Sequence, residues 1–541
     1  MQEWDNTVDV VVLGTGGAGL TAALTAAVGG ASVALYEKSG TVGGTTAVSG
    51  GIAWIPAHDR APGLTVEAAL DYLRAQSFGA MDDELVTTFV RTGPEMVDFV
   101  EKHSDVRFEV ASGFPDYKPE LPGGRPSGGR SLSPLPYDLA RLGPWQNRIT
   151  AFPADYSNVG FDAETRARLH ADIDDATSGD ICVAGTALIA GLLRGVLDAG
   201  ITPATNCRGT ELIAERSAQH PGVAGVRVEC QTGSVRVRAR RGVILANGGF
   251  EWDTSLVEAF LRGPMRGAVS PPNNTGDALR MAMAHGADLA NMGEAWWVPI
   301  VRIPGDTIDG HQRSRSVRLE RTRPRSIIVN RSGRRFVNEA CDYNSMAGAF
   351  HFLEPRGGYV NDPAWIVFDA EHLRRFGFLG TPPGGEVPDW FAQAPDLPGL
   401  AAAAGIDERG LTSTVAAWNR DVAADCDSEF GRGSSAYDGY WGDDQGTTLA
   451  GRTLGPLDTA PYYAVPLSVG SMGTKGGPRT DGDGRVLHVT GHPIRGLFAA
   501  GNAMAGVTGR AYGGAGGTIG PAMVFGFRAG QAAAGNAILA D

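Results

Sequence analysis

A strand, a glycine-rich turn and a helix follow one another near the N-terminus, and this unit constrains the fold more than any other feature. Residues 9–13 (DVVVL) form an apolar, β-branched run of strand length, and the sequence GTGGAG follows at residues 14–19. An Ala- and Leu-rich helical pattern then covers about residues 20–28, and a second strand, SVALYE, ends at Glu37. Two strands joined in this way pair in parallel, with a right-handed crossover. The unit therefore predicts an α/β domain built on a parallel sheet.

The glycines of this turn fit the GxGxxG pattern of a Rossmann-like, dinucleotide-binding domain. Gly14 allows the tight turn, Gly16 lets the backbone approach a pyrophosphate, and Gly19 lets the helix pack closely on the strand. The N-terminus of the helix then faces the phosphates with its partial positive charge. Glu37 can accept hydrogen bonds from the adenosine ribose hydroxyls. The predicted nucleotide contacts are Gly14, Gly16, Gly17, Ala18, Gly19, Glu37 and Lys38.

Segments beyond the motif distinguish FAD from NAD. Residues 43–51 place small hydroxyl-bearing and bare-backbone residues just beyond the ribose site, where a long cofactor folded across the sheet would continue. Two further segments, NGG at residues 247–249 and GN at residues 501–502, each end a strand. Together they resemble the three segments that surround FAD in the fumarate reductase and succinate dehydrogenase flavoprotein superfamily. The resemblance implies FAD as cofactor, in contact also with Gly43, Gly44, Thr45, Thr46, Ser49, Gly50, Gly51, Asn247, Gly248, Gly249, Asp277, Gly501, Asn502, Thr518 and Ile519.

Composition limits the function classes and suggests the domain organisation. The chain has 541 residues, and its 77 glycines are roughly twice the usual share, which indicates many tight turns and close backbone approaches. A net charge of −13 disfavours nucleic-acid binding. Residues 279–464 are denser in Trp, Pro and Arg and contain the short strand patterns RSIIVN, RRFVNE and AWIVFD. We therefore expect a Rossmann-like FAD-binding domain in residues 1–278 and 465–541, with an α+β catalytic domain inserted at residues 279–464.

The cysteines and the N-terminal region indicate neither a metal site nor a membrane anchor. The five cysteines are odd in number, lie far apart in the sequence and form no CxxC or Cys/His spacing, so we expect no disulfide framework and no metal. The uncharged run at residues 10–36 is interrupted by glycines, which predicts no transmembrane segment. The polar N-terminus lacks the pattern of a signal peptide and predicts a cytoplasmic protein. The cysteines are Cys182, Cys207, Cys230, Cys341 and Cys426.

Three tyrosines and one glycine stand in segments that narrow the family further. Tyr117 lies in PDYKPELPGG at residues 115–124, and Tyr343 ends FVNEACDY at residues 336–343. Tyr512 and Gly516 lie in YGGAG, which is followed by TIG. In these segments the chain resembles the 3-ketosteroid Δ1-dehydrogenases, which belong to the same flavoprotein superfamily.

The resemblance implies a reaction and a role for each residue. Oxidising a saturated carbon pair beside a ketone removes a proton from the α-carbon and a hydride from the β-carbon. The hydroxyl of Tyr512 and the backbone N–H of Gly516 are expected to donate to the keto oxygen as enolate charge develops. Tyr343 is expected to abstract the proton, assisted by a hydrogen bond from Tyr117. Because a free tyrosine has a pKa of about 10, activity should rise toward alkaline pH. The expected partners are a steroid-like ketone and a separate electron acceptor.

Two other hypotheses remain open. Arg510, two residues before Tyr512, can bind a carboxylate and is the best argument for a reductase of α,β-unsaturated carboxylates, similar to fumarate reductases. The three tyrosines argue against that reading, and the basic run at residues 313–325 fits either a carboxylate-binding patch or a solvated face. Gly514 stands where the related Δ4-(5α)-dehydrogenases are expected to have Ser, which favours the Δ1 reaction. A flavin-binding protein without its own catalysis is disfavoured by the intact set of polar residues.

Overall fold

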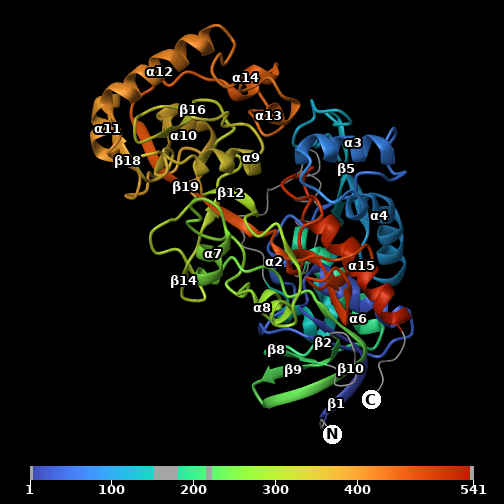
Figure 1. Cartoon of the computed structure of the whole chain (residues 1–541). Helices are drawn as coiled ribbons and strands as arrows, with labels where there is room; N and C mark the ends of the chain where they lie inside the picture. The colour runs from blue at the N-terminus through green and yellow to red at the C-terminus, as the bar shows by residue number, and fades with distance from the viewer. Residues whose placement is uncertain (1–3, 151–180, 215–221, 537–541) are drawn as a thin grey trace.

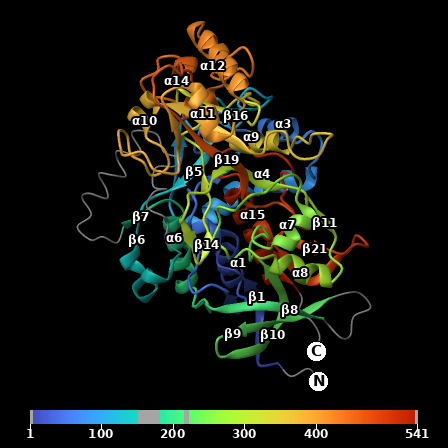
Figure 2. The ribbon, with the colours of Figure 1, turned by 90° about the vertical axis from the view of Figure 1, so that its left-hand side faces the viewer.

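The computed structural model describes residues 4–150, 181–214 and 222–536, and these form two lobes (Figure 1). In that view the lower lobe contains a seven-stranded sheet and the upper lobe a six-stranded sheet. Strand β19 (Tyr462–Thr474) belongs to the upper sheet and points toward the lower lobe in both ribbon views (Figure 1 and Figure 2). The chain enters the upper lobe from the lower one and returns through this strand.

The lower sheet is built on the predicted strand–helix–strand unit. Its strands are β1 (Asn6–Leu13), β2 (Val33–Tyr36), β8 (Cys207–Ala214), β9 (Val223–Cys230), β10 (Gly233–Leu245), β21 (Arg485–Leu487) and β22 (Pro493–Ala499). β1 pairs in parallel with β2 and β10, and β10 pairs in parallel with β22. β9 pairs antiparallel with β10 and β8, and β21 with β22. The prediction of a Rossmann-like α/β fold is confirmed.

Helices α1 (Gly17–Val28) and α15 (Ile519–Gly535) pack closely beside this sheet. A Cβ at Gly526 would lie 2.4 Å from the Ala18 carbonyl oxygen. The two helices can therefore approach this closely only because residue 526 is a glycine. The other helices of the lower lobe are α2 (Gly44–Ala47), α3 (Val66–Ser77), α4 (Asp83–His103), α6 (Ala184–Asp198), α7 (Thr254–Phe260) and α8 (Asp277–Ala284), with 3-10 helices η1 (Leu139–Arg148) and η4 (Gly501–Ala503). Smaller sheets are formed by β3 (Ala53–Trp54), β4 (Phe108–Ser112) and β5 (Gly128–Pro134), by β6 (Tyr137–Asp138) and β7 (Ile181–Cys182), and by β11 (Leu289–Ala290) and β20 (Gly477–Pro478).

The upper sheet is antiparallel and has a separate hydrophobic core on each face. Its strands, besides β19, are β12 (Ala295–Val301), β15 (Arg315–Ser316), β16 (Ser326–Asn330), β17 (Ala364–Asp369) and β18 (Ala392–Ala394). The strands predicted at RSIIVN and AWIVFD are confirmed as β16 and β17, but the one at RRFVNE is wrong, because that segment is irregular. Its buried Arg335 is tied to Glu339 at 2.7 Å and to Asp427 at 2.8 Å, so side-chain ion pairs take the place of a strand ladder. β19 crosses the predicted domain limit at residue 465, and the domain limits stay a prediction.

The helices of the upper lobe are short except for one. They are α9 (Tyr343–Gly348), α10 (Ala370–Phe376), α11 (Leu397–Ala404), α12 (Glu408–Ala423), α13 (Ala436–Tyr440) and α14 (Leu449–Thr453), with the 3-10 helix η3 (Ala349–His351). The hairpin of β13 (Thr307–Ile308) and β14 (His311–Gln312) lies beside α7, and its His311 packs against Trp252. Within the described ranges, none of the helices of either lobe has the length and apolar character that crossing a bilayer requires.

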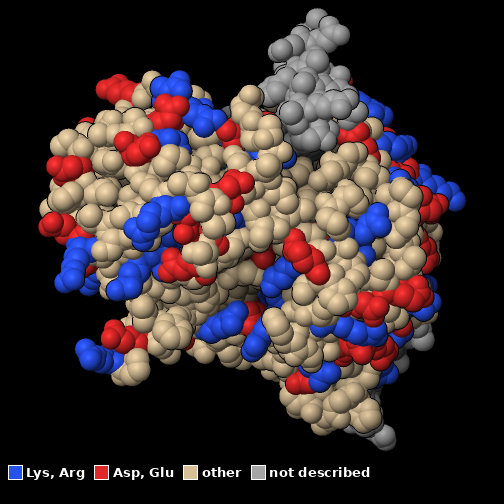
Figure 3. Space-filling view, turned by 90° about the horizontal axis from the view of Figure 1, so that it is seen from above, with Lys and Arg blue, Asp and Glu red and all other residues tan. Residues whose placement is uncertain are grey.

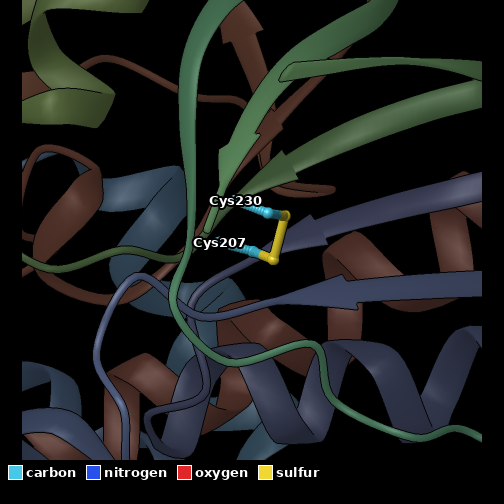
Figure 4. The surroundings of a disulfide bond; sticks show 2 residues. All are labelled: Cys207 and Cys230. Carbon is cyan, nitrogen blue, oxygen red and sulfur yellow. A yellow bond between two sulfur atoms is a disulfide. The ribbon is translucent and has the colours of Figure 1, made fainter. Parts of the chain in front are cut away.

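The structure has one disulfide bond, which the sequence analysis, expecting no disulfide framework, did not predict. Cys207, at the start of β8, is bonded to Cys230, at the end of β9 (Figure 4). The two residues are direct partners across antiparallel strands, with Cα atoms 4.2 Å apart. Sequence spacing could not reveal this pair, because the register of the hairpin rather than a motif brings the two residues together. Cys182, Cys341 and Cys426 carry free thiols.

Candidate active site

One cavity extends from the glycine-rich turn after β1 to the predicted tyrosines. It is lined at one end by Gly14, Glu37 and Lys38 and at the other by aromatic side chains that include Tyr117 and Tyr343. Seen from above, the molecule is hollowed at its centre, and charged side chains border the hollow (Figure 3). The cavity therefore joins the two sets of residues that the sequence predicted separately.

The glycine turn has the geometry of a phosphate cradle. Gly14 has φ +104°, and a Cβ there would lie 2.5 Å from the Ala246 carbonyl oxygen. A Cβ at Gly19 would lie 2.0 Å from the Gly14 carbonyl oxygen, so Gly19 serves packing rather than contact with a ligand. Helix α1 begins at Gly17, and its N-cap residue, Gly16, provides no capping side chain. The Gly17 N–H donates to Thr46 Oγ1 at 3.1 Å, and the positive end of α1 faces the cavity wall, where it favours an anion.

Charged residues at this end are oriented by hydrogen bonds. The carboxylate of Glu37 accepts from Thr15 Oγ1 at 2.7 Å and from the Ser39 N–H at 2.9 Å. Lys38 Nζ donates to Asp277 at 3.0 Å, and Arg208 donates to the same carboxylate at 2.6 Å. Burial acts to raise the pKa of Asp277, but the hydrogen bond of Arg208 and the charge of Lys38 outweigh burial and hold the pKa below its usual value. Lys38 and Asp277 therefore form an ion pair at the wall of the cavity.

Most of the residues predicted to bind FAD line this cavity. Gly19, Gly43 and Gly249 are the exceptions and lie behind its wall. Gly43 has φ +114°, and a Cβ at Gly249 would lie 2.3 Å from Thr474 Oγ1, so both positions shape the backbone. The lining set is Gly14, Gly16, Gly17, Ala18, Glu37, Lys38, Gly44, Thr45, Thr46, Ser49, Gly50, Gly51, Asn247, Gly248, Asp277, Gly501, Asn502, Thr518 and Ile519.

A dinucleotide fits this end of the cavity on two structural grounds. The start of α1, whose N-cap residue Gly16 has no capping side chain, lies at the wall with the positive end of the helix dipole. Asn247 Oδ1 is buried at the same wall and has no hydrogen-bond partner among the described residues, so a ligand with hydroxyl or N–H donors would satisfy it. The individual contact assignments stay predictions.

The three tyrosines converge at the opposite end. The hydroxyl oxygens of Tyr117 and Tyr343 are 2.6 Å apart, and Tyr343 donates to the Tyr512 oxygen at 3.0 Å. Thr518 Oγ1 also donates to Tyr512, at 3.2 Å. Each tyrosine is 5–6% exposed. Because the Tyr512 oxygen already accepts two hydrogen bonds, its own hydrogen is left to donate to a ligand in the cavity.

Distant segments hold these phenols in place. Tyr343 is the first residue of α9, which is capped by Asp342. The Tyr117 backbone N–H donates to the Gly513 carbonyl at 3.0 Å, which joins the Tyr117 loop directly to the Tyr512 loop. The same Gly513 carbonyl accepts from the Tyr72 hydroxyl at 2.7 Å. Three stretches of the chain thus meet in one hydrogen-bonded cluster.

Burial controls the protonation of the cluster. It raises the pKa values of Tyr117 and Tyr343 well above the usual value, and it also raises that of Tyr512. The neighbouring phenols raise the pKa of Tyr343 further, whereas the charge of Arg318 and the hydrogen bond from Tyr117 oppose the shift. The three phenols are therefore neutral at neutral pH in the absence of a ligand.

Gly516, four residues after Tyr512, also lines the cavity. Besides leaving room for a ligand, a glycine is required here by backbone packing. Gly516 has φ +92°, and a Cβ there would lie 2.4 Å from the Ile52 carbonyl oxygen and 2.6 Å from the Trp54 nitrogen. The close approach of strand β3, as well as access for a ligand, requires a glycine at this position.

Several lining residues were missed by the sequence analysis. Phe114, Tyr437 and Trp441 line the cavity, and the ring centroid of Tyr437 is 5.1 Å from that of Tyr117. Arg318 also lines the cavity and belongs to the basic run at residues 313–325, for which the sequence left open a carboxylate-binding patch or a solvated face. The dense aromatic sequence YDGYWG around Tyr437 was the available signal. Arg510, by contrast, lies outside the lining and is paired with Glu294 at 3.2 Å.

A buried lysine lies behind Tyr512. Lys475 is 1% exposed, and its Nζ is 4.1 Å from the ring centroid of Trp296 and 5.8 Å from that of Tyr512. It donates to the carbonyl of Ala511 at 3.0 Å and so supports the turn that precedes Tyr512. Burial lowers the pKa of Lys475 to about 7, although the charge of Glu294 acts in the opposite direction.

Comparison with known proteins agrees with this geometry. Residues 9–519 match the family described as FAD binding domain. The chain is 40% identical to 4-oxocyclohexanecarboxylate 2-dehydrogenase of Sinomonas cyclohexanicum, covering 98% of this chain and 94% of the relative. It is 38% identical to 3-oxosteroid 1-dehydrogenase of Mycobacterium tuberculosis, covering 96% and 97%. The crystal structure of 3-ketosteroid Δ1-dehydrogenase from Sterolibacterium denitrificans in complex with 1,4-androstadiene-3,17-dione superposes with a TM-score of 0.88 at 32% identity, covering 98% and 99%.

The fold and the cavity define a FAD-dependent oxidoreductase of the flavoprotein superfamily. Within it, the chain belongs to the family of the 3-ketosteroid Δ1-dehydrogenases, whose members act on CH–CH bonds. The predictions of the family and of FAD as cofactor are confirmed. The cytoplasmic location and the residue roles stay predictions.

Proposed function

We propose that this protein catalyses the FAD-dependent 1,2-desaturation of a ring ketone, a 3-ketosteroid or a similar cyclic ketone. The observation that carries the proposal is the cluster of three phenols at one end of the cavity, with oxygen separations of 2.6 and 3.0 Å. The names of the relatives support the reaction, since they are dehydrogenases of cyclic ketones. The names of these relatives include both a steroid substrate and a single-ring substrate, so the proposal covers both ring systems.

The keto oxygen is bound by Tyr512 and Gly516. The Tyr512 oxygen accepts a hydrogen bond from Thr518, and its own hydrogen can donate to the keto oxygen. A second donor, the Gly516 backbone N–H, completes an oxyanion site that strengthens as negative charge develops on the keto oxygen. Polarisation of the ketone in this way makes the α-proton acidic enough for removal.

Tyr343 accepts the α-proton as its phenolate. The 2.6 Å hydrogen bond to Tyr117 stabilises that phenolate, because Tyr117 can donate to it. The raised pKa of Tyr343 makes the phenolate scarce at neutral pH, so the rate rises with pH. Tyr117 is thus a positioning and stabilising partner of the base.

The cofactor supplies what these residues cannot. When bound, FAD accepts the hydride that leaves the β-carbon. The positive end of α1 at the cavity wall and the oriented carboxylate of Glu37 would hold its nucleotide portion. Reoxidation requires a separate electron acceptor, which we also propose.

The alternative, reduction of an unsaturated carboxylate, is less supported. Its best argument was Arg510, which is paired with Glu294 and lies outside the cavity lining. The phenol cluster has no part in that chemistry. We therefore keep the desaturase as the single proposed function.

Anaerobic mixing of the flavin-loaded protein with saturated and unsaturated compounds tests the proposal. Bleaching of the flavin absorption by a saturated ring ketone, together with appearance of the conjugated enone, is the expected result. Bleaching by none of the ring ketones, with reoxidation of the prereduced enzyme by fumarate or another enoate, would instead establish the reductase.

A further inference from the structure

A disulfide bond lies at the nucleotide end of the cavity. Cys207 lines this end together with Glu37 and Arg208, and it is bonded to Cys230 (Figure 4). We propose that this cysteine pair is a site of thiol–disulfide exchange that controls FAD affinity. A dithiol that reduces the bond weakens FAD binding, and bound FAD protects the bond from the dithiol. The inference concerns the cofactor, so it does not depend on which substrate the enzyme oxidises.

The residues that lead to the bond fix the backbone of Glu37. The Glu37 N–H donates to the carbonyl of Ala204 at 2.9 Å, and the Glu37 carbonyl accepts from the Cys207 N–H at 2.8 Å. The Asn206 N–H donates to the carbonyl of Ser39 at 2.9 Å. The segment that ends at Cys207 therefore holds both sides of the residue whose carboxylate is expected to bind the adenosine ribose.

The residue after the bond connects it to an ion-pair chain at the same wall. Arg208 donates to Asp277 at 2.6 Å, and the same carboxylate accepts from Lys38 Nζ at 3.0 Å. All three of these residues line the cavity. A displacement of Cys207 would therefore disturb the backbone of Glu37 and these charged groups together.

The bond fastens the cavity end of strand β8. β8 lies at the edge of the lower sheet, where it pairs with β9 alone among the described strands. The register shifts between Gly209 and Glu211, so an irregularity separates the cavity end of β8 from the rest of its ladder. A short edge segment opens at a lower free-energy cost than a central strand. Breaking the bond is therefore expected to loosen this end of β8 while the central strands stay paired.

The surroundings of the two sulfur atoms suit exchange at Cys230. Cys207 is 8% exposed at the cavity wall, whereas Cys230 is half-buried and lies outside the lining. A thiolate of the dithiol attacks Cys230 Sγ, the S–S bond breaks, and Cys207 Sγ leaves with the electron pair and takes up a proton. The second thiolate of the dithiol then displaces Cys230 Sγ and closes the disulfide of the dithiol. Two electrons thus pass from the dithiol to the cysteine pair.

The free thiols provide an internal control. Burial raises the pKa of Cys182 to about 12 and raises the pKa of Cys341 well above its usual value. Both thiols are therefore protonated at neutral pH and react poorly with disulfides. Cys426 is exposed and lies outside the cavity lining, so replacing it removes an accessible thiol without touching the nucleotide end.

Equilibrium with a dithiol measures the protection. The full-length apoprotein is equilibrated anaerobically with mixtures of reduced and oxidised dithiothreitol, with and without saturating ADP, and its thiols are counted by alkylation and mass spectrometry. ADP is the nucleotide half of FAD, and the dithiol cannot reduce it. We expect ADP to shift the midpoint toward a higher ratio of reduced to oxidised dithiothreitol, by about 5- to 150-fold, the usual range of coupling between two sites. An unchanged midpoint, or a bond that is reduced only when the protein unfolds, would overturn the inference.

FAD titration measures the same coupling from the other side, because linkage is reciprocal. The double variant Cys207→Ser, Cys230→Ser should bind FAD about 5- to 150-fold more weakly than the oxidised wild type. Cys426→Ser is the matched control and should bind FAD as the wild type does. Wild-type affinity in a folded double variant, or an equal loss in Cys426→Ser, would contradict the assignment.

A titration of the wild type keeps the test decisive if the double variant does not fold. The oxidised protein and the protein reduced by dithiothreitol are each titrated with ADP. The oxidised form should bind ADP more tightly, by the same factor as the midpoint shift. Equal affinities in the two forms would show that the bond has only a structural role and would overturn the inference.

Discussion

The two ends of the cavity are built in different ways. The nucleotide end is made mainly of backbone, with Gly14 in a conformation reserved for glycine and the first turn of α1 open to an anion. The ketone end is made of side chains, with three phenols from distant segments in one hydrogen-bonded cluster. The first end needs a short local motif, whereas the second exists only after both lobes have folded. The comparison predicts that changes at one end affect flavin binding and changes at the other affect turnover.

The largest effect is expected for Tyr343→Phe at the ketone end. Removing the hydroxyl takes away the proton acceptor, so we expect kcat to fall by about 10²- to 10⁴-fold. Flavin content should remain that of the wild type, because the ring still fills its buried site. The measurement is anaerobic flavin reduction by a ring ketone in a stopped-flow instrument.

A pH profile separates chemistry from packing in this variant. Because burial raises the pKa of Tyr343 well above 10, the wild-type rate should increase steadily with pH up to the limit of enzyme stability. The residual rate of Tyr343→Phe should lose that dependence. A variant with undiminished turnover, or with an unchanged pH profile, would remove Tyr343 from the role of base.

A smaller effect, on FAD affinity rather than on turnover, is expected for Gly16→Ala at the nucleotide end. A Cβ at Gly16 would meet no atom closer than Thr46 Oγ1, at 3.6 Å, and its φ of −69° suits alanine. The fold should therefore survive. If the backbone at this turn must contact a pyrophosphate, the added methyl group should weaken FAD binding by about 10- to 100-fold, a loss of roughly 1.4–2.8 kcal/mol.

Titration of the apoprotein with FAD measures this effect, and circular dichroism checks the fold. Enzyme saturated with FAD should turn over within a few-fold of the wild type, in contrast to Tyr343→Phe. Wild-type FAD affinity in a folded Gly16→Ala protein would place the pyrophosphate elsewhere. A folded variant that binds FAD normally but does not turn over would contradict the prediction that the nucleotide end affects only flavin binding.

The same contrast explains what the sequence could predict. The turn at Gly14, the parallel strands and the nucleotide contacts were predicted from local patterns, whereas the remaining FAD contacts and the tyrosines were predicted by resemblance to a family rather than by spacing. The Cys207–Cys230 bond was missed because it depends on strand register. Arg510 was misjudged for a related reason, since its partner, Glu294, is far away in the sequence. Contacts between residues that are far apart in the chain are difficult to predict from a single sequence.

The smallest effect is expected for Lys475→Met, which tests the support behind Tyr512. Burial lowers the pKa of Lys475 to about 7 in the folded protein, against about 10.5 for an exposed lysine. Between these values the unfolded chain binds a proton that the folded protein does not, so this group's contribution to stability increases as pH rises through that window. Below pH 7 both states are protonated and the contribution becomes constant.

Methionine has a similar length and no charge, so the variant lacks this dependence while still filling the site. The free energy of unfolding of the wild type, relative to that of Lys475→Met, should therefore increase as pH rises from 7 to 9. The increase is at most about 1.4 kcal/mol per pH unit, which corresponds to about 1 °C in Tm for a chain of this size. The measurement is the difference in Tm between the two flavin-loaded proteins at several pH values. A difference that stays constant would mean that Lys475 keeps its proton, held by Glu294 and the face of Trp296. In that case a permanent cation lies behind Tyr512, and the ketone end depends on fixed charge rather than on neutral hydrogen bonds.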